Sequence, residues 1–178
     1  MWWWKKKKKE ERPLVERSFS WEMLPTDPAV YRPLIKENER DPYAIAAFSV
    51  IAFALYALDP ETAFAMLSLL KAPAPLPLAE RRFIADRLDY GKDYKPYSFF
   101  VGATPQNNYR PDLPYLLKVF EQKESFNDQG YATLYLQSSG SSLPRKIRLR
   151  KREDGSWRLE EEFLLADIIA PKKDNPWA

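Results

Sequence analysis

The stretch from Asp41 to Leu70 constrains the fold most, because it is the only part of the chain apolar enough to form a core by itself. Asp41 and Pro42 are typical of a helix start: the aspartate accepts a hydrogen bond from a free backbone amide, and proline at the first helical position loses no donor. From Tyr43 to Leu58 the chain runs sixteen residues without a charge. Large apolar side chains lie on every side of this helix, which predicts burial on more than one face.

Asp59 and Pro60 repeat the start signal, and Lys71 suits the negative end of a second helix. The sequence therefore predicts helices over residues 42–58 and 60–71, packed as a hairpin. A membrane span is the rival interpretation, but sixteen residues cover only about 24 Å of a hydrocarbon core roughly 30 Å thick. Since Asp59 and Glu61 would also interrupt any longer span, we favour the core hairpin.

The prolines at positions 73, 75 and 77 predict an extended break, after which residues 78–88 have the periodicity of a third helix. The second half of the chain changes to the period of strands. Strands are predicted over residues 97–102, 114–121, 131–137, 145–152 and 157–163. Helices followed by strands indicate an α+β fold. We expect a helical hairpin and a third helix packed on an antiparallel sheet of four to five strands, with a cone-shaped sheet as one option.

Composition divides the chain into three parts. These are a basic tail (residues 1–12), a proline-rich arm (residues 13–40) and a single α+β domain (residues 41–178). In the arm, Phe19 and Trp21 belong to an alternating aromatic patch that suits an extended segment wrapped across the domain. Asp27 and Pro28 form a further helix start, and a short helix is predicted through Leu34 to Arg40.

The last two strands are predicted to pair through a three-residue loop, residues 153–155, with Gly155 in the left-handed conformation. This register gives three cross-strand pairs: Leu149 with Leu159, Arg148 with Glu160, and Lys146 with Glu162. A two-residue loop would instead place Leu149 against Glu160. Because the chosen register supplies acidic neighbours to the basic run 145–152, it disfavours a free nucleic-acid surface on that strand.

The absence of histidine and cysteine excludes imidazole and thiol catalysis, His/Cys zinc sites and disulfides. The five glycines are scattered too widely for a phosphate-cradling loop. We therefore assign no catalytic, cofactor-binding or metal-binding residue and expect no cofactor. One polar and aromatic cluster lies at the junction of the third helix and the first predicted strand, and we interpret it as a loop with satisfied hydroxyls. Its members are Asp86, Asp89, Tyr90, Asp93, Tyr94 and Tyr97.

The net charge of +3 has its origin in the tail. Residues 1–12 hold six basic and two acidic side chains, a surplus of four, so the remaining 166 residues carry a net charge of −1. Because residues 13–178 are so close to neutral, they produce no overall positive electrostatic potential that would attract nucleic acid. We do not expect nucleic acid as a partner.

The tail itself combines indole rings with a run of lysines. Indoles settle at the headgroup level of a bilayer, and lysines are attracted to anionic lipid. The candidate membrane-surface residues are Trp2, Trp3, Trp4, Lys5, Lys6, Lys7, Lys8 and Lys9. The order of charged and apolar residues is not that of a secretory signal. We expect a cytoplasmic chain whose tail is either solvated or held peripherally at the inner face of the membrane.

Three segments carry a resemblance to a known family: FSWEMLP (residues 19–25), NNYRPDLPYLLKVFE (107–121) and GYATLYLQSSGSSLPRKIRLRKREDGSWRLEEEFLL (130–165), followed by the terminal DNPWA. The chain resembles an uncharacterised bacterial domain family known mainly from Firmicutes, and the resemblance implies no activity. Helices followed by a curved antiparallel meander are also similar, at the level of the fold, to the cone-shaped fold of the nuclear transport factor 2 and steroid isomerase group.

Two functional hypotheses follow from these observations. The first is a non-catalytic binding or scaffolding module, whose partner is a protein or an anionic membrane surface. The alternative is a small-molecule pocket enzyme that uses Asp and Tyr side chains in a cone-shaped sheet. An enclosed cavity of about 300 Å³ or more with a buried carboxylate would favour the enzyme.

Overall fold

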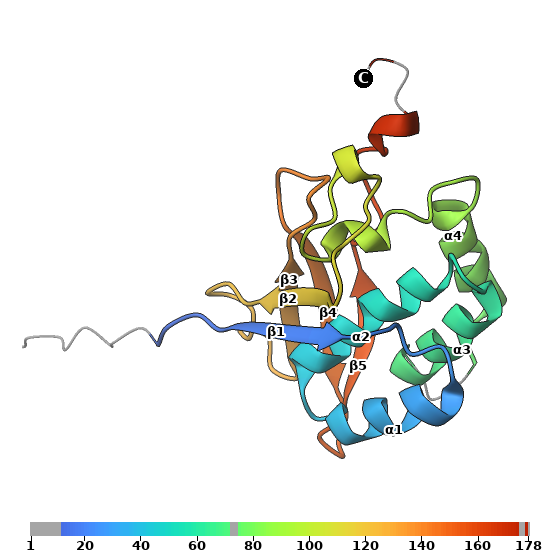
Figure 1. The fold of residues 1–178 in the computed structure, drawn as a ribbon. Helices are drawn as coiled ribbons and strands as arrows, with labels where there is room; N and C mark the ends of the chain where they lie inside the picture. The colour runs from blue at the N-terminus through green and yellow to red at the C-terminus, as the bar shows by residue number, and fades with distance from the viewer. Residues whose placement is uncertain (1–11, 72–74, 175–176, 178) are drawn as a thin grey trace, which may run out of the picture.

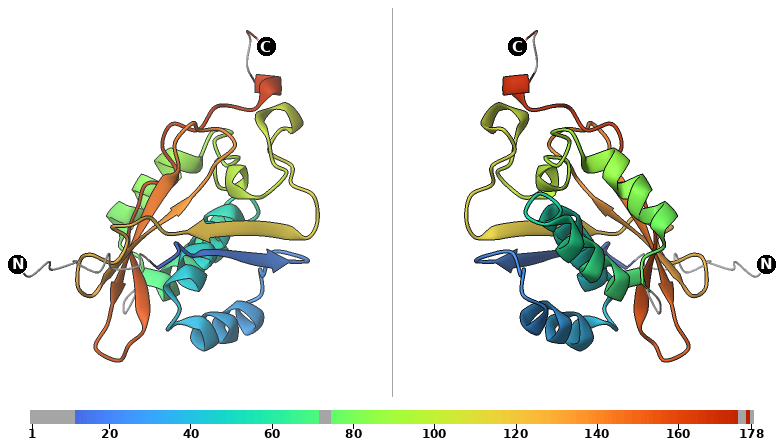
Figure 2. Two further views of the ribbon diagram at one scale, coloured as in Figure 1. Left: turned by 90° about the vertical axis from the view of Figure 1, so that its left-hand side faces the viewer. Right: turned by 90° about the vertical axis from the view of Figure 1, so that its right-hand side faces the viewer.

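A computed structural model describes residues 12–71, 75–174 and 177. This part of the chain forms four α-helices and a five-stranded antiparallel sheet, so the predicted α+β class is confirmed. The helices are α1 (Pro28–Asn38), α2 (Pro42–Leu55), α3 (Pro60–Lys71) and α4 (Leu78–Leu88). The strands are β1 (Glu16–Trp21), β2 (Tyr115–Phe120), β3 (Tyr131–Leu136), β4 (Arg145–Lys151) and β5 (Trp157–Glu162). The strands form one layer and the helices cover one side of it (Figures 1 and 2).

Helix α2 is the centre of the core. Asp41 caps it by accepting a hydrogen bond from the Tyr43 N–H at 3.0 Å, as the Asp-Pro signal predicts. Every residue from 44 to 55 is buried, because the helix packs against α3 on one side and the sheet on the other. The helix ends at Leu55 and not at Leu58, since residues 56–58 make the turn that leads into α3. No helix in the described ranges is long and apolar enough to cross a membrane.

The sheet has the strand order β1-β2-β3-β4-β5, with every neighbouring pair antiparallel, and it does not close into a barrel. Its two halves meet at a bend. Strands β2 and β3 pair at a single position, Phe120 with Tyr135, whereas six residue pairs join β1 to β2 and another six join β3 to β4. As a result β1 and β2 run across the direction of β3 to β5 (Figure 1).

The prediction of a strand over residues 97–102 is wrong. Pro96 instead begins a short 3-10 helix, η1 (Pro96–Phe99), and Phe100 makes only an isolated bridge to Leu117. Ser98, Phe99 and Phe100 are all buried, so the segment does not alternate between two faces as a strand does. It fills the space where β2 and β3 diverge, with the Val101 N–H bonded to β2 and the Ser98 carbonyl bonded to the Ser139 N–H.

The arm that precedes α2 is more regular than the sequence predicts. Its aromatic patch forms the edge strand β1, where Phe19 and Trp21 face the core, and Trp21 lies against Phe48 of α2 at a ring distance of 6.1 Å. Its helix begins at Pro28, directly after the Asp27 cap, and includes Pro33. The start signal at Asp27 and Pro28 is therefore confirmed, and the helix ends at Asn38, two residues before the predicted Arg40.

The predicted register of the last hairpin holds next to the loop and shifts beyond it. Leu149 pairs with Leu159, and Gly155 has a positive φ of 85°. A bulge between Arg148 and Leu149 then makes Glu161, not Glu160, the backbone partner of Arg148. The Arg148 side chain still reaches Glu160 at 3.1 Å, so the predicted ion pair is present. The same bulge places Glu162 opposite Ile147, so the predicted pair of Lys146 with Glu162 is wrong. The backbone carbonyl of Lys146 instead accepts a hydrogen bond from the Phe163 N–H.

Candidate functional site: a tyrosine-lined cleft

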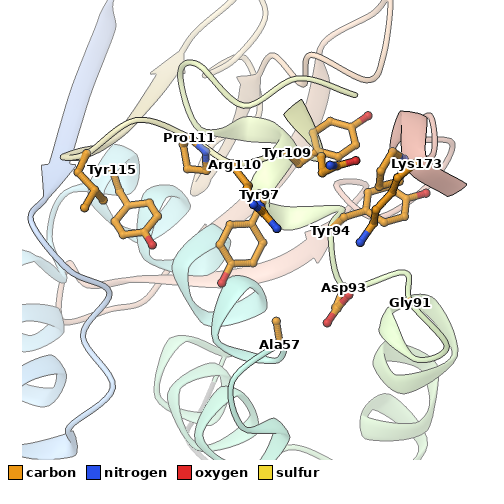
Figure 3. A pocket seen from close by; sticks show the side chains of 13 residues that line it. Ala57, Gly91, Asp93, Tyr94, Tyr97, Tyr109, Arg110, Pro111, Tyr115 and Lys173 are labelled. Atoms are coloured by element: carbon orange, nitrogen blue, oxygen red, sulfur yellow. The ribbon is translucent and has the colours of Figure 1, made fainter. Parts of the chain in front are cut away.

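An open cleft of about 630 Å³ lies at the end of the domain that carries the C-terminal segment. We call it the tyrosine cleft. Its walls come from four parts of the chain: residue 57 after α2, residues 91–97 after α4, residues 108–115 before β2, and residues 171–173. Figure 3 shows Tyr94, Tyr97, Tyr109 and Tyr115 around the opening. The volume falls within the range of small-molecule sites in proteins, about 300–1,000 Å³.

One wall is a pair of stacked tyrosines held by the C-terminal segment. The rings of Tyr94 and Tyr109 are nearly parallel, with centroids 5.3 Å apart and an interplanar angle of 9°. The Tyr94 hydroxyl donates to the Ile168 carbonyl at 3.1 Å, and the Tyr109 hydroxyl donates to the Ile169 carbonyl. We call residues 164–173 the C-terminal strap. These two bonds place Pro171 of the strap at the edge of the cleft.

Gly140 also holds the strap, through a backbone hydrogen bond. Its carbonyl accepts the Ile169 N–H at 3.0 Å, and a Cβ atom at this position would lie only 2.2 Å from the Tyr109 hydroxyl. No side chain fits there without displacing the ring or the strap. Tyr109 itself has a positive φ of 54°, as does Asn108 at 58°, so two consecutive residues adopt a left-handed backbone in this wall.

The opposite wall is built on Phe100. Tyr97 and Tyr115 both tilt against this buried ring, with centroid distances of 5.9 and 5.2 Å. Burial raises the pKa of Tyr97 to about 12, and burial raises that of Tyr109 to about 12 as well. Both phenols therefore stay protonated at neutral pH. Since Tyr97 already donates to the Ala54 carbonyl at 3.3 Å, neither hydroxyl is placed to act as a base.

Three charged side chains line the cleft without a partner among the described residues. Arg110 and Lys173 are exposed, and Asp93 is half-buried; none of the three makes an ion pair or a side-chain hydrogen bond within the described ranges. Figure 3 shows the two cations on the upper side of the opening and the carboxylate below them. In the wall that contains Tyr109, the Oδ1 atom of Asn108 is buried with no described hydrogen-bond partner. Buried polar atoms normally have a hydrogen-bond partner, so the Asn108 Oδ1 atom is available to accept a hydrogen bond from a ligand.

A second cleft, of about 370 Å³, lies between α4 and β5 and differs in this respect. Its Lys71 forms an ion pair with Glu80, and its Glu162 accepts the Leu164 N–H at 2.7 Å. Glu160, also in this cleft, is held by Arg148. Lys71, Glu160 and Glu162 thus have partners within the protein, and among the described residues only the exposed Glu161 of this cleft has none, so the tyrosine cleft is the better candidate for a ligand site.

The residues singled out from the sequence have different outcomes. The tail residues Trp2 to Trp4 and Lys5 to Lys9 lie outside the described residues. On the basic run of β4, Arg148 is bound by Glu160 and Asp128, and Lys146 lies over the Phe163 ring at 4.7 Å. Among the described residues no group of acidic side chains is arranged to hold a metal ion.

The interpretation of the polar and aromatic cluster around the end of α4 as a loop with satisfied hydroxyls describes only part of it. Asp89 accepts the Tyr56 hydroxyl, and the Tyr94 and Tyr97 hydroxyls are bonded. Asp93, Tyr94 and Tyr97 nevertheless line the cleft. Sequence reasoning missed Tyr109, Arg110, Tyr115 and Lys173, which join the site only through the path of the folded chain. The one available signal was the adjacency of aromatic and basic residues in NNYRPDLPY.

Fold and site together define an α+β protein with an open antiparallel sheet and one tyrosine-lined cleft at its end. The profile of a family described as a domain of unknown function (DUF6935) matches residues 23–172, which is most of the chain. The chain belongs to this family. The match includes every cleft residue except Lys173. No curated protein and no solved structure matches the chain, so the likeness to the nuclear transport factor 2 fold stays a prediction.

Proposed function

We propose that this protein is a non-catalytic binding module and that the tyrosine cleft is its ligand site. The observation that carries the proposal is a set of three charges between aromatic walls, Arg110, Lys173 and Asp93, that have no partner among the described residues. Hydrogen bonds between charged groups and a ligand are the stronger ones in proteins, and aromatic side chains supply area at a small entropic cost. A ligand with an apolar body and an anionic group fits this arrangement.

The alternative, an enzyme that uses Asp and Tyr, has less support. Acid and base catalysis needs a group that gains or loses a proton near neutral pH. The raised pKa values of Tyr97 and Tyr109 keep these phenols protonated. Asp93 is the only carboxylate that lines the cleft within the described residues, and the cleft is open to solvent rather than enclosed. Among the described residues the cleft therefore has no second carboxylate with which Asp93 could divide the acid and base roles.

Filling the cleft should abolish ligand binding. Ala57 is exposed at the cleft, so Ala57→Arg is expected to occupy the opening without entering the core. The probes are benzoate, phenyl phosphate and indole-3-acetate, titrated into the full chain and followed by amide chemical shifts in NMR spectra. We expect saturable shifts around residues 93–97 and 108–115 for at least one probe, with affinity reduced about tenfold or more in Ala57→Arg.

The matched control is Ala79→Arg, which adds the same side chain at an exposed position of α4 that does not line the cleft. It should bind as the unmodified protein does. Shifts that stay unchanged in Ala57→Arg, or the absence of saturable shifts for all three probes, would show that the cleft is not a ligand site.

The tail supports a second proposal, attachment to an anionic membrane surface. Its sequence places three indoles beside five lysines. The tail joins the domain at a fixed point, because Arg12 forms an ion pair with Glu121 at 2.7 Å and the Val15 N–H donates to the same carboxylate at 3.1 Å. A tail bound to a bilayer would thus be joined to the domain beside the end of β2.

Liposome co-sedimentation tests the tail. The unmodified chain should pellet with anionic vesicles and less with neutral ones, and salt should weaken the binding without abolishing it, since only the lysine contribution is screened. The comparison is a variant with alanine at residues 2–4 and serine at residues 5–9, which keeps Arg12. Equal pelleting of the two proteins on anionic vesicles would mean that the tail is a solvated extension.

A further inference from the structure

The charges of the tyrosine cleft are separated by sign. Arg110 and Lys173 lie on one side of the opening and Asp93 on the other (Figure 3). All three lack a described partner. A single anionic group would satisfy the cations and leave the carboxylate alone, whereas a cationic ligand would do the reverse. A ligand that satisfies both sides carries an anionic group at one end and N–H donors at the other.

Aromatic rings line the cleft beside these charges (Figure 3). Tyr97 and Tyr115 are half-buried against Phe100, so each ring presents its remaining surface to the cleft. Tyrosine faces of this kind stack planar heterocycles without selecting among them. The part of the ligand between the anionic group and the donors is therefore planar and aromatic, and the cleft has room for a body larger than one ring.

We propose that the ligand is a free nucleoside monophosphate. The inference rests on the proposed function and names the ligand class of the same cleft. Arg110 and Lys173 bind the phosphate, and the base lies along the Tyr97 side of the cleft. Asp93 accepts N–H groups from the base edge, as carboxylates do when they read exocyclic amino groups. Guanine is the favoured base, because it presents two adjacent donors to the two oxygens of one carboxylate.

A nucleotide within a strand fits the charge of the protein less well. The tail holds six basic and two acidic residues, a net charge of +4, whereas the whole chain has a net charge of +3. Residues 13–178 therefore carry a net charge of −1. Binding to a polynucleotide depends on several cations that follow the backbone and release counterions. On β4, the basic run is partly engaged by Glu160 and Asp128. The cleft offers cations for one phosphate and no continuous basic path.

Calorimetric titration of the full chain tests the proposal. The probes are GMP, AMP, CMP and UMP, with guanosine and inorganic phosphate as the two halves of the ligand and a short single-stranded oligonucleotide as the polymer. We expect GMP to bind most tightly, at least about tenfold tighter than inorganic phosphate or guanosine, and the oligonucleotide to bind no better than GMP.

Two substitutions separate the ends of the ligand. Arg110→Ala should weaken all four nucleotides by about 10- to 100-fold and leave guanosine unchanged, since it removes a charge-assisted bond to phosphate. Asp93→Asn should weaken GMP and reduce the differences among the four bases without changing phosphate binding. Arg82→Ala removes an exposed arginine of α4 that does not line the cleft, and it should alter nothing.

Several results would overturn the inference. One is that no nucleotide binds with a dissociation constant below about 1 mM. Others are phosphate binding as tightly as GMP, an oligonucleotide that binds more tightly than GMP, or a base ranking unchanged by Asp93→Asn. If these occur while the aromatic acids still bind and Ala57→Arg removes them, the ligand class is wrong and the binding function stands. If nothing binds the cleft, the proposed function fails as well.

Discussion

Replacing Phe48 with alanine is expected to lower the free energy of unfolding by about 3–5 kcal/mol. Phe48 lies on α2, where every residue from 44 to 55 is buried, and only 5% of its surface is exposed. Its ring packs against Trp21 of β1, so it joins the central helix to the edge of the sheet. The substitution removes apolar contacts and leaves a cavity that neighbouring elements of the core cannot close.

Urea unfolding followed by circular dichroism measures this change. The matched control is Leu58→Ala, because Leu58 follows the same helix but is 62% exposed, and it should change the free energy by less than about 0.5 kcal/mol. An unchanged m-value would show that both proteins expose similar surface on unfolding. A loss below about 1 kcal/mol for Phe48→Ala would mean that α2 is not the centre of the core.

The helices were predictable because their signals are local. Asp41 with Pro42 and Asp27 with Pro28 mark helix starts that the structure contains, with the aspartates accepting hydrogen bonds from Tyr43 and Ala29. Such caps depend on residues two or three positions apart, so sequence alone is enough to find them. The absence of charge from residues 43–58 likewise identifies a buried helix without any knowledge of its neighbours.

The errors occur where distant residues decide the structure. Segment 16–21 becomes a strand because it pairs with β2, about a hundred residues later, and no local pattern distinguishes it from an extended arm. Segment 97–102 has the aromatic residues of a strand, yet the divergence of β2 and β3 leaves a space that buries Phe99 and Phe100 together. Strand preference mostly reflects the surface available for packing, which the sequence does not display.

The candidate site depends on the same kind of long-range information. Asp93, Tyr94 and Tyr97 are recognisable as a cluster from the sequence alone, since they lie within five residues of one another. Arg110 enters the site through the segment that precedes β2, and Lys173 enters it where the strap crosses Tyr94 and Tyr109. A single sequence can therefore indicate one part of such a cleft, and the paths of the strap and of the segment before β2 determine the other walls.

The second large effect is expected at Glu121, whose carboxylate joins three parts of the fold. It is buried, with 2% of the residue exposed, at the end of β2. It accepts hydrogen bonds from Arg12, from the Val15 N–H at 3.1 Å and from the hydroxyl of Tyr43 in the first turn of α2. The N-terminal arm, the central helix and the sheet are thus connected through one side chain.

Burial alone would raise the pKa of Glu121, but the hydrogen bonds from Tyr43, Arg12 and Val15 outweigh it and lower the pKa below its ordinary value. A carboxyl group whose pKa is lower in the folded than in the unfolded protein contributes stability above the unfolded value, which is about 4.3 for glutamate. That contribution is lost as the pH falls through the folded value. The protein should therefore lose stability below about pH 4, in part through this group.

Glu121→Gln should lower the free energy of unfolding at pH 7 by about 1–3 kcal/mol, because the amide keeps the shape but offers one acceptor oxygen where the carboxylate offers two. Urea unfolding at pH 7, 5, 4 and 3 separates this charge effect from a packing effect. The difference between the two proteins should shrink as the pH falls, since protonated Glu121 resembles glutamine. Glu153→Gln is the control, as Glu153 is exposed and makes no described contact, and its difference should stay near zero throughout. A Glu121→Gln difference that stays constant from pH 7 to pH 3 would show that the ionised carboxylate does not hold the arm to the domain.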